Sequence, residues 1–99
     1  MPLLNISLQE GFQNDLVIIR INGREVLQRD QVSTKLLLGY ADSVAMEVPA
    51  GNLQVEIILP QRNLSATIPL QLRAATYLSV SIAAGQIDYF VSAVPFGFM

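Results

Sequence analysis

A Ser-Thr-Lys run at residues 33–35 places hydroxyl groups beside the only lysine of the chain. A hydroxyl becomes a nucleophile when a neighbouring base takes its proton, and Lys35 would have to be desolvated to serve as that base. The alternative interpretation is a polar loop that carries a solvated lysine. We favour the loop, so this run predicts no catalytic residue.

Two glutamates, Glu47 and Glu56, could form the paired carboxylates of a sugar hydrolase. A hairpin that turns at Ala50-Gly51 would place Glu47 opposite Gln54, with Glu56 diagonal to it. Both side chains would then lie on a face that we expect to be solvated, whereas a catalytic acid needs burial to raise its pKa. We therefore interpret them as solvent-facing residues and do not expect the chain to be an enzyme.

Oxygen ligands gather around Gly11, where Glu10, Asn14 and Asp15 flank a loop. Calcium takes several oxygen ligands, but this spacing does not match a known calcium loop. Asn and Asp also favour turns for conformational reasons, so we predict a turn here and no metal site. The chain has no His and no Cys, which excludes zinc, haem-thiolate and iron–sulfur ligation, and no cofactor is expected.

Charged residues are scarce in this chain: they make up 14% of it, against 52% hydrophobic residues, and the net charge is -2. The six basic residues are scattered, so we expect no nucleic-acid partner. No apolar stretch reaches the ~18 residues of a membrane helix, so no membrane insertion is expected. A small domain has a large surface for its volume, and so few charges would leave apolar surface exposed. We therefore expect a homo-oligomer or another protein partner.

Apolar and polar residues alternate along most of the chain, which is the period of a β-strand. The nearly continuous apolar run LVIIRI at residues 16–21 is interpreted as a strand buried on both sides. The Asn22-Gly23 pair that follows is typical of a type I′ hairpin turn, because both central residues of that turn take positive φ. The pairs expected across this hairpin are Arg20 with Glu25 and Ile19 with Val26.

A second hairpin is predicted over residues 43–59, with its turn at Ala50-Gly51. Both halves alternate, and this register places the apolar residues of both halves on one face. A slip of one residue would scatter them over both faces. The expected pairs are Val48 with Leu53, Met46 with Val55, and Val44 with Ile57.

Two later segments complete the predicted strands. Residues 64–72 alternate but contain Pro69, which argues against a central strand, and we expect this segment to cross to a second sheet. A type II′ turn at Gly85-Gln86 is expected to close the last hairpin and to pair Ile82 with Tyr89.

No helical period persists, although residues 30–41 fit either a strand or a helical turn. Short strands separated by frequent turn signals indicate an all-β fold. We predict an antiparallel β-sandwich of about seven strands, Ig-like or transthyretin-like, in which residues 1–99 form a single domain.

The segments LVIIRING at residues 16–23 and SVAMEVPAGNLQVEII at residues 43–58 resemble PEGA-type and transthyretin-like (carboxypeptidase regulatory-like) sandwich modules. Those modules contain a strand that ends in a short xVxING turn and a later vPaG turn that begins an alternating strand. The chain departs from the pattern in two places, because no Thr-Pro follows the first hairpin and no Gly-Tyr follows the long strand. The resemblance implies a non-catalytic accessory or interaction module and supplies no catalytic residues.

The C-terminal tail, VSAVPFGFM, has no charged side chain after Asp88. Aromatic residues and Met are enriched at protein interfaces. The tail could fold back on its own core, or it could dock on a neighbouring subunit. We predict a non-enzymatic structural or protein-interaction module that self-associates through apolar sheet-face and C-terminal tail residues. The predicted interface residues are Phe90, Phe96, Phe98 and Met99.

The alternative function is a small-ligand or carbohydrate-binding β-sandwich module. Such a module needs exposed aromatic platforms, and the chain has no Trp. The possible ligand-contact residues are therefore Tyr40, Tyr77 and Tyr89.

Overall fold

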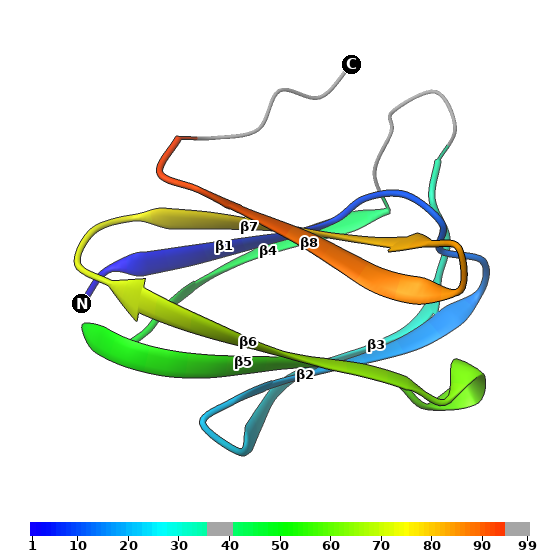
Figure 1. Ribbon diagram of the computed structural model, residues 1–99, viewed down its shortest axis with the longest axis horizontal. Helices are drawn as coiled ribbons and strands as arrows, with labels where there is room; N and C mark the ends of the chain where they lie inside the picture. The colour runs from blue at the N-terminus through cyan, green and yellow to red at the C-terminus, as the bar shows by residue number, and fades with distance from the viewer. Residues whose placement is uncertain (36–40, 95–99) are drawn as a thin grey trace.

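The computed structural model describes residues 1–35 and 41–94, which form two facing β-sheets (Figure 1). The all-β prediction is confirmed, with eight strands in the described residues where about seven were expected. The elements are β1 (Leu3–Leu8), β2 (Asp15–Ile21), β3 (Arg24–Val32), β4 (Asp42–Glu47), β5 (Gly51–Leu59), the 3₁₀ helix η1 (Pro60–Arg62), β6 (Leu64–Leu72), β7 (Thr76–Ala83) and β8 (Gln86–Ser92).

Each sheet has four strands. Sheet A has the order β4-β1-β7-β8, and sheet B has the order β3-β2-β5-β6. Every pair is antiparallel except β1 with β7, which is parallel, so the expectation of a wholly antiparallel sandwich is wrong at this pair. Parallel strands need a long connection, and here β2 to β6 lie between the two partners in sequence. Hairpin turn signals cannot reveal such a pairing.

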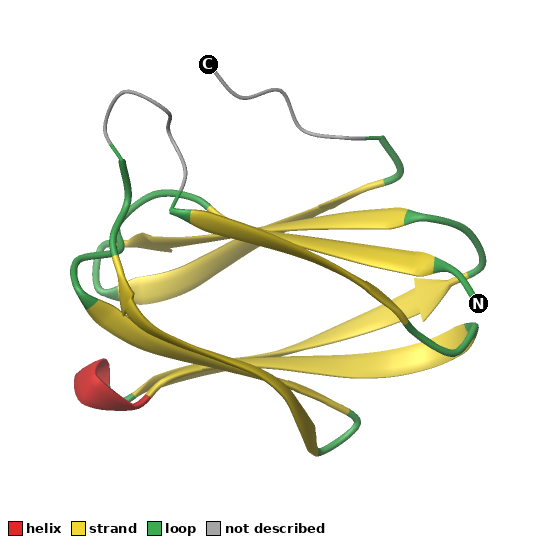
Figure 2. Cartoon of the chain, turned by 180° about the vertical axis from the view of Figure 1, so that it is seen from behind, coloured by secondary structure: helices red, strands yellow, loops and turns green. Residues whose placement is uncertain are grey.

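The two sheets enclose one hydrophobic core, with β6 and β8 along one open side (Figure 1) and β3 and β4 along the other (Figure 2). Alternate residues of each strand point into this core, as the period of two predicts. The residues that are no more than 1% exposed are Leu4, Ile6, Val17, Ile19, Val55, Ile57, Leu59, Ile68, Leu72, Leu78 and Val80.

The first hairpin confirms the predicted turn. Asn22 and Gly23 have φ of 52° and 82°, and Arg20 pairs with Glu25 as expected. Beyond that pair a register shift places Ile19 opposite Leu27, so the expected Ile19–Val26 pair is wrong. Such a bulge adds one residue to one strand and changes the face of the β3 residues that follow, until a second register shift between Asp15 and Val17.

The predicted hairpin over residues 43–59 is wrong. β4 pairs with β1, and β5 pairs with β2 and β6, so the chain crosses from sheet A to sheet B between them. The backbone N–H of Val48 still donates to the carbonyl oxygen of Pro2, which extends the β1–β4 pairing to the crossing. The apolar residues of both strands do face the same core, because the alternation that suits a hairpin also suits two strands facing each other across a sandwich.

The expected crossing before residues 64–72 is also wrong, since β6 pairs with β5 along its full length. The loop of residues 60–63 contains η1 and ends at Asn63 with φ of 54°, which sets Leu59 opposite Leu64 and aligns the apolar faces. β6 is an edge strand of sheet B, and this position tolerates Pro69 as predicted.

The last hairpin turns one residue earlier than predicted. Ala84 and Gly85 both have positive φ, and Ile82 pairs with Ile87 rather than with Tyr89. The pairing is displaced by two residues, an even number, so each residue keeps its predicted face. In the stretch 30–41, β3 continues to Val32, while residues 36–40 lie outside the described residues.

Candidate functional site

Strand β8 exposes large apolar side chains on both of its faces. Tyr89, Phe90 and Val91 are 44%, 64% and 43% exposed, and Val94 just beyond the strand is 64% exposed. These are four of the seven large hydrophobic residues that are exposed in the described ranges. Exposed apolar side chains are therefore concentrated at this edge and are not spread evenly over the surface.

The register explains this exposure. Tyr89 lies opposite Val80 and Val91 lies opposite Leu78, so both point to the core side of sheet A. Because β8 is the outermost strand, these side chains cover only the margin of the core and remain accessible to solvent. Phe90 lies opposite Ser79 and points to the outer face of the sheet.

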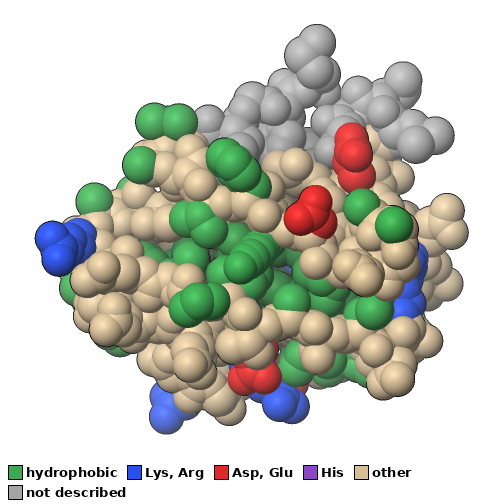
Figure 3. Space-filling view, in the orientation of Figure 1, with side chains coloured by type: hydrophobic (Ala, Val, Ile, Leu, Met, Phe, Trp, Pro, Cys, Tyr) green, Lys and Arg blue, Asp and Glu red, His purple; other side chains and the backbone are tan. Residues whose placement is uncertain are grey.

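The open side of the sandwich beside β8 carries a band of hydrophobic side chains between the two sheets (Figure 3). Ile87, which is partly buried against the core, continues the row of Tyr89 and Val91. We call the apolar residues of this edge the β8 surface; they are Ile87, Tyr89, Phe90, Val91 and Val94.

The outer face of sheet A next to the β8 surface is formed mainly of small uncharged residues. In register, Ser43, Ser7 and Ser79 form a row across the sheet that ends at Phe90. Ser7 and Ser79 are only 8% and 9% exposed, so little of this row is accessible to solvent. The same face also carries two carboxylates, because Glu47 on β4 and Asp88 on β8 point away from the core.

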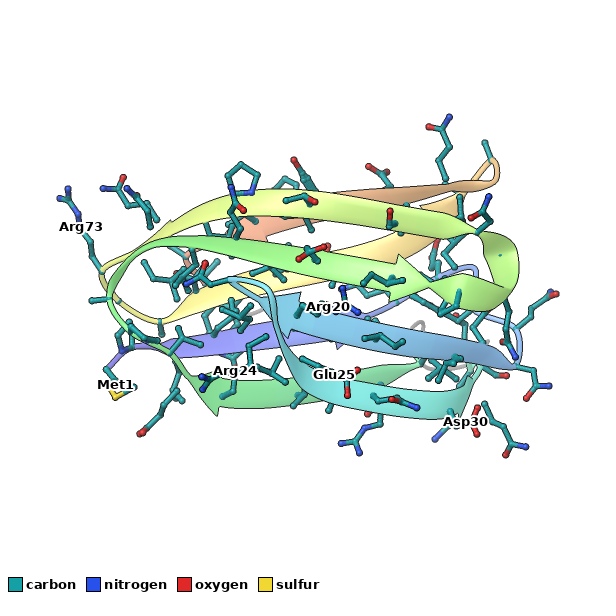
Figure 4. All side chains as sticks on the ribbon, turned by 90° about the horizontal axis from the view of Figure 1, so that it is seen from below. Met1, Arg20, Arg24, Glu25, Asp30 and Arg73 are labelled. Carbon is teal, nitrogen blue, oxygen red and sulfur yellow. The ribbon has the colours of Figure 1, made fainter. Side chains whose placement is uncertain are left out.

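The outer face of sheet B carries charged side chains of both signs. Arg20 on β2 lies in register with Glu25 on β3 (Figure 4). On its other side Arg20 lies in register with Glu56 on β5. Opposite charges directly across neighbouring strands stabilise the sheet modestly and keep this face hydrated.

Of the predicted interface residues, Phe90 lies on the β8 surface. Phe96, Phe98 and Met99 lie outside the described residues. They follow the β8 surface directly in the sequence.

The predicted ligand-contact tyrosines do not come together as a platform. Tyr77 lies opposite Ser92 and points to the outer face of sheet A, whereas Tyr89 points to the core side of the same sheet. Tyr40 lies outside the described residues. Two rings on opposite faces of one sheet cannot stack on the same ligand.

The candidate carboxylate pair is also separated. Glu47 is on β4 of sheet A opposite Leu3, and Glu56 is on β5 of sheet B opposite Thr67. Both point away from the core, so they lie on opposite outer faces of the sandwich. The expected diagonal arrangement of Glu47 and Glu56 is wrong because the hairpin on which it depended does not form.

The hydroxyls of the Ser-Thr-Lys run hold the loop of residues 9–14 in place. The hydroxyl oxygen of Thr34 accepts from the backbone N–H of Phe12 at 3.1 Å, and the hydroxyl donates to the carbonyl oxygen of Gln9 at 2.6 Å. The hydroxyl oxygen of Ser33 accepts from the backbone N–H of Asn14 at 2.8 Å. Lys35 is exposed, as the loop interpretation expects.

The acidic loop at residues 10–15 is built around an ion pair. The carboxylate of Asp15 accepts from Nε of Arg62 at 2.8 Å and from Nη2 of Arg62 at 2.9 Å. Nη2 of Arg62 also donates to the carbonyl oxygen of Gly11, and the Asp15 side chain is 4% exposed. In the described residues, no group of three or more His, Cys, Asp or Glu side chains could hold a metal ion.

The same ion pair affects the titration of Arg62. The hydrogen bond to Asp15 is the largest cause that raises the pKa of Arg62, the charge of Asp15 raises it further, and desolvation opposes both. A raised pKa in the folded chain means that the stabilisation is present below the ordinary pKa of arginine. It is lost only when the solution becomes strongly alkaline.

Sequence reasoning found part of the β8 surface. The prediction included Phe90 as an interface residue and Tyr89 as a ligand contact, but did not single out Val91 and Val94. Their exposure follows from the place of β8 at the edge of sheet A. The feature of the sequence that pointed to this surface is the stretch without charged residues after Asp88.

No protein-family model, no curated protein and no solved structure matches the chain.

Among the described residues there is no helix with the length and hydropathy needed to span a membrane.

Proposed function

We propose that this chain is a non-enzymatic protein-interaction module that self-associates, and that two copies meet through the β8 surface. The observation that carries the proposal is the gathering of Tyr89, Phe90, Val91 and Val94 on one edge strand, each at least 43% exposed. Burial of apolar area gains ~25 cal/mol per Å² removed from water. A surface of this kind is the strongest source of association energy that the described residues offer.

The four edge strands of the sandwich are protected to different degrees. β3 carries Arg24, Glu25, Arg29 and Asp30, β4 carries a charge at each end, and β6 is interrupted by Pro69. Charges and proline on an edge strand discourage pairing with another chain. β8 carries a single charge, Asp88, and no proline, so it has few of these protections against a strand of a second copy.

The size of the surface is compatible with a specific contact. A stable interface buries about 800 Å² on each partner, which is roughly one eighth of the 6011 Å² accessible surface of the chain. The β8 surface would contribute to this area. Phe96, Phe98 and Met99 belong to the same proposed interface because they follow it directly in the sequence.

We also propose the transthyretin-like rather than the Ig-like form of the sandwich. In the immunoglobulin arrangement the first two strands are neighbours in one sheet. Here β1 lies in sheet A and β2 lies in sheet B, with β1 beside β7 instead. This strand order supports the transthyretin-like alternative of the two types that the sequence suggested.

Sedimentation velocity over a dilution series tests the proposed self-association. The double variant Phe90→Ser, Val91→Thr removes two exposed apolar side chains, and we expect it to raise the dissociation constant at least about tenfold. The matched control is Val26→Thr, which changes an apolar residue of similar exposure (41%) on the charged edge strand β3. Deletion of residues 95–99 should also weaken assembly.

The proposal fails if the unaltered chain sediments as a monomer at every concentration. It fails equally if the double variant and the Val26→Thr control assemble to the same extent. Circular dichroism of each variant verifies that the sheet content is retained, so that a change in assembly is not a change in folding.

A further inference from the structure

Four side-chain amides line a hollow on the outer face of sheet B, next to the β2–β3 turn. The hollow has a volume of about 510 Å³. None of its lining residues is charged, and the remaining lining residues are Leu53, Pro69 and Leu70. The four amides belong to Asn22, Asn52, Gln54 and Gln71.

The backbone holds these amides in fixed relative positions. Asn52 lies directly opposite Gln71, and Gln54 lies opposite Pro69, all on the outward side of the β5–β6 pair. Asn22 is bound to the same strand twice: its N–H donates to the carbonyl oxygen of Gln54, and its Oδ1 accepts from the N–H of Gln54, each at 2.9 Å. The strands and the turn fix the backbone from which the amides project, while the exposed side chains of Asn52, Gln54 and Gln71 are ordered only when a ligand binds, at a cost of about 0.5–1.5 kcal/mol each.

The amides are available for binding. The side chains of Asn52, Gln54 and Gln71 are exposed and make no hydrogen bond to any other residue that the structure describes. The Asn22 side chain makes one hydrogen bond, in which its Oδ1 accepts from the backbone N–H of Gln54. Each amide therefore offers an NH₂ donor group, and three of the four also offer an unused carbonyl acceptor.

We propose that this hollow binds a neutral, hydroxyl-rich ligand of the oligosaccharide class. A pair of neighbouring sugar hydroxyls offers a donor and an acceptor side by side, which matches the NH₂ and carbonyl groups of a single amide. The lack of charge in the lining gives no attraction for phosphate, carboxylate or metal ions. The ring of Pro69 supplies an apolar contact for the C–H groups of a sugar.

The site is made of other residues than the β8 surface. Its lining comes from the β2–β3 turn, β5 and β6 of sheet B, whereas β8 is the outermost strand of sheet A. The site is also distinct from the tyrosines that the sequence suggested as ligand contacts. Tyr77 and Tyr89, the two of them that the structure describes, belong to sheet A.

Side-chain NH₂ signals in a ¹H–¹⁵N correlation spectrum report on the site directly. The probes are maltohexaose, cellohexaose and laminarihexaose, each titrated to millimolar concentration. We expect at least one of them to shift the NH₂ signals of Asn22, Asn52, Gln54 and Gln71 in a saturable way. Binding should be insensitive to added salt and to pH near neutrality, because no lining group carries a charge.

The variant Asn52→Ala, Gln71→Ala should weaken binding at least about fivefold, since it removes two amides of the hollow. Gln28→Ala is the matched control, because Gln28 is an exposed amide on β3 of the same sheet outside the hollow. The inference is overturned if none of the three probes shifts the four signals, if the double variant binds as the control does, or if the shifts fall on Tyr77 and Tyr89 instead. Sedimentation of the same samples reports on self-association separately, so the failure of one proposal is distinguishable from the failure of the other.

Discussion

Removal of the Arg62 side chain should destabilise this protein far more than removal of Arg29, although each arginine forms one ion pair. Arg62 binds Asp15 through two hydrogen bonds, and the Asp15 side chain is 4% exposed. Arg29 contacts Asp42 at 3.2 Å, and these side chains are 49% and 38% exposed. The pair of variants Arg62→Ala and Arg29→Ala therefore compares a shielded ion pair with a hydrated one in the same molecule.

The expected magnitudes follow from burial. Arg62→Ala leaves the carboxylate of Asp15 out of water with the backbone N–H of Gln13 as its remaining donor, and it also removes the bond to the carbonyl oxygen of Gly11. Breaking a buried pair costs about 3–5 kcal/mol of unfolding free energy. The Arg62 side chain is 30% exposed, and water can enter after truncation, so we expect the lower end, about 3 kcal/mol. For Arg29→Ala we expect a loss of no more than about 0.5 kcal/mol, because exposed pairs are screened by solvent.

Urea unfolding followed by far-ultraviolet circular dichroism measures both losses. With a slope of about 1.5 kcal/mol per M, the unfolding midpoint of Arg62→Ala should fall by about 2 M, and that of Arg29→Ala by less than about 0.4 M. Both variants and the unaltered chain are compared at one protein concentration, because the proposed self-association would add to the apparent stability. Equal midpoints for the two variants would refute the reasoning that burial of Asp15 sets the cost.

Two further predictions concern the loop that the ion pair holds. Gly11 and Gly23 have similar φ, +86° and +82°, but a Cβ on Gly11 would collide with the carbonyl oxygen of Ile82, whereas nothing lies within 4 Å of one on Gly23. Gly11→Ala should lower the free energy of unfolding by about 3 kcal/mol or more, and Gly23→Ala by about 1 kcal/mol. Urea unfolding measures both losses, and losses of similar size would contradict the collision at Gly11. Thr34→Val removes the hydroxyl that joins Phe12 and Gln9, so it should lower the free energy of unfolding by about 1–3 kcal/mol. Thr34→Ser keeps the hydroxyl and should lose much less stability. A thermal unfolding series measures the difference, and equal melting temperatures for Val and Ser would show that the hydroxyl does not hold the loop.

Local features of the fold followed from the residues alone. The alternation in β5 and β7 correctly identified the apolar side chains that are buried, because successive residues of a strand point to opposite faces. It did not identify Ser79, which is buried on the outward side of β7. The Asn22-Gly23 turn was identified because few residue pairs tolerate two successive positive φ angles. Each of these signals depends on the backbone geometry of a few neighbouring residues.

Only part of the candidate site could be predicted from the sequence. The lack of charge after Asp88 indicated an apolar surface near the C-terminus, and Phe90 lies on it. No sequence pattern indicated the amide hollow, because Asn22, Asn52 and Gln71 come from three separate parts of the chain: the β2–β3 turn, β5 and β6. Asp15 was considered as a calcium ligand or a turn residue, and its actual partner, Arg62, is 47 residues away.

The sequence by itself determined that the chain forms strands, which apolar side chains of β5 and β7 are buried and where the tight turn after β2 falls, because these depend on interactions between near neighbours. The expectation that residues 16–21 are buried on both sides is wrong, since β2 buries alternate residues and exposes Arg20. Only the tertiary structure decided that β4 pairs with β1 rather than β5, that β1 lies parallel to β7 and that β8 is left at an edge. The physical reason is that every exposed strand edge offers the same backbone donors and acceptors. Alternation fixes the face of a strand, and the choice of partner is made by packing the whole core.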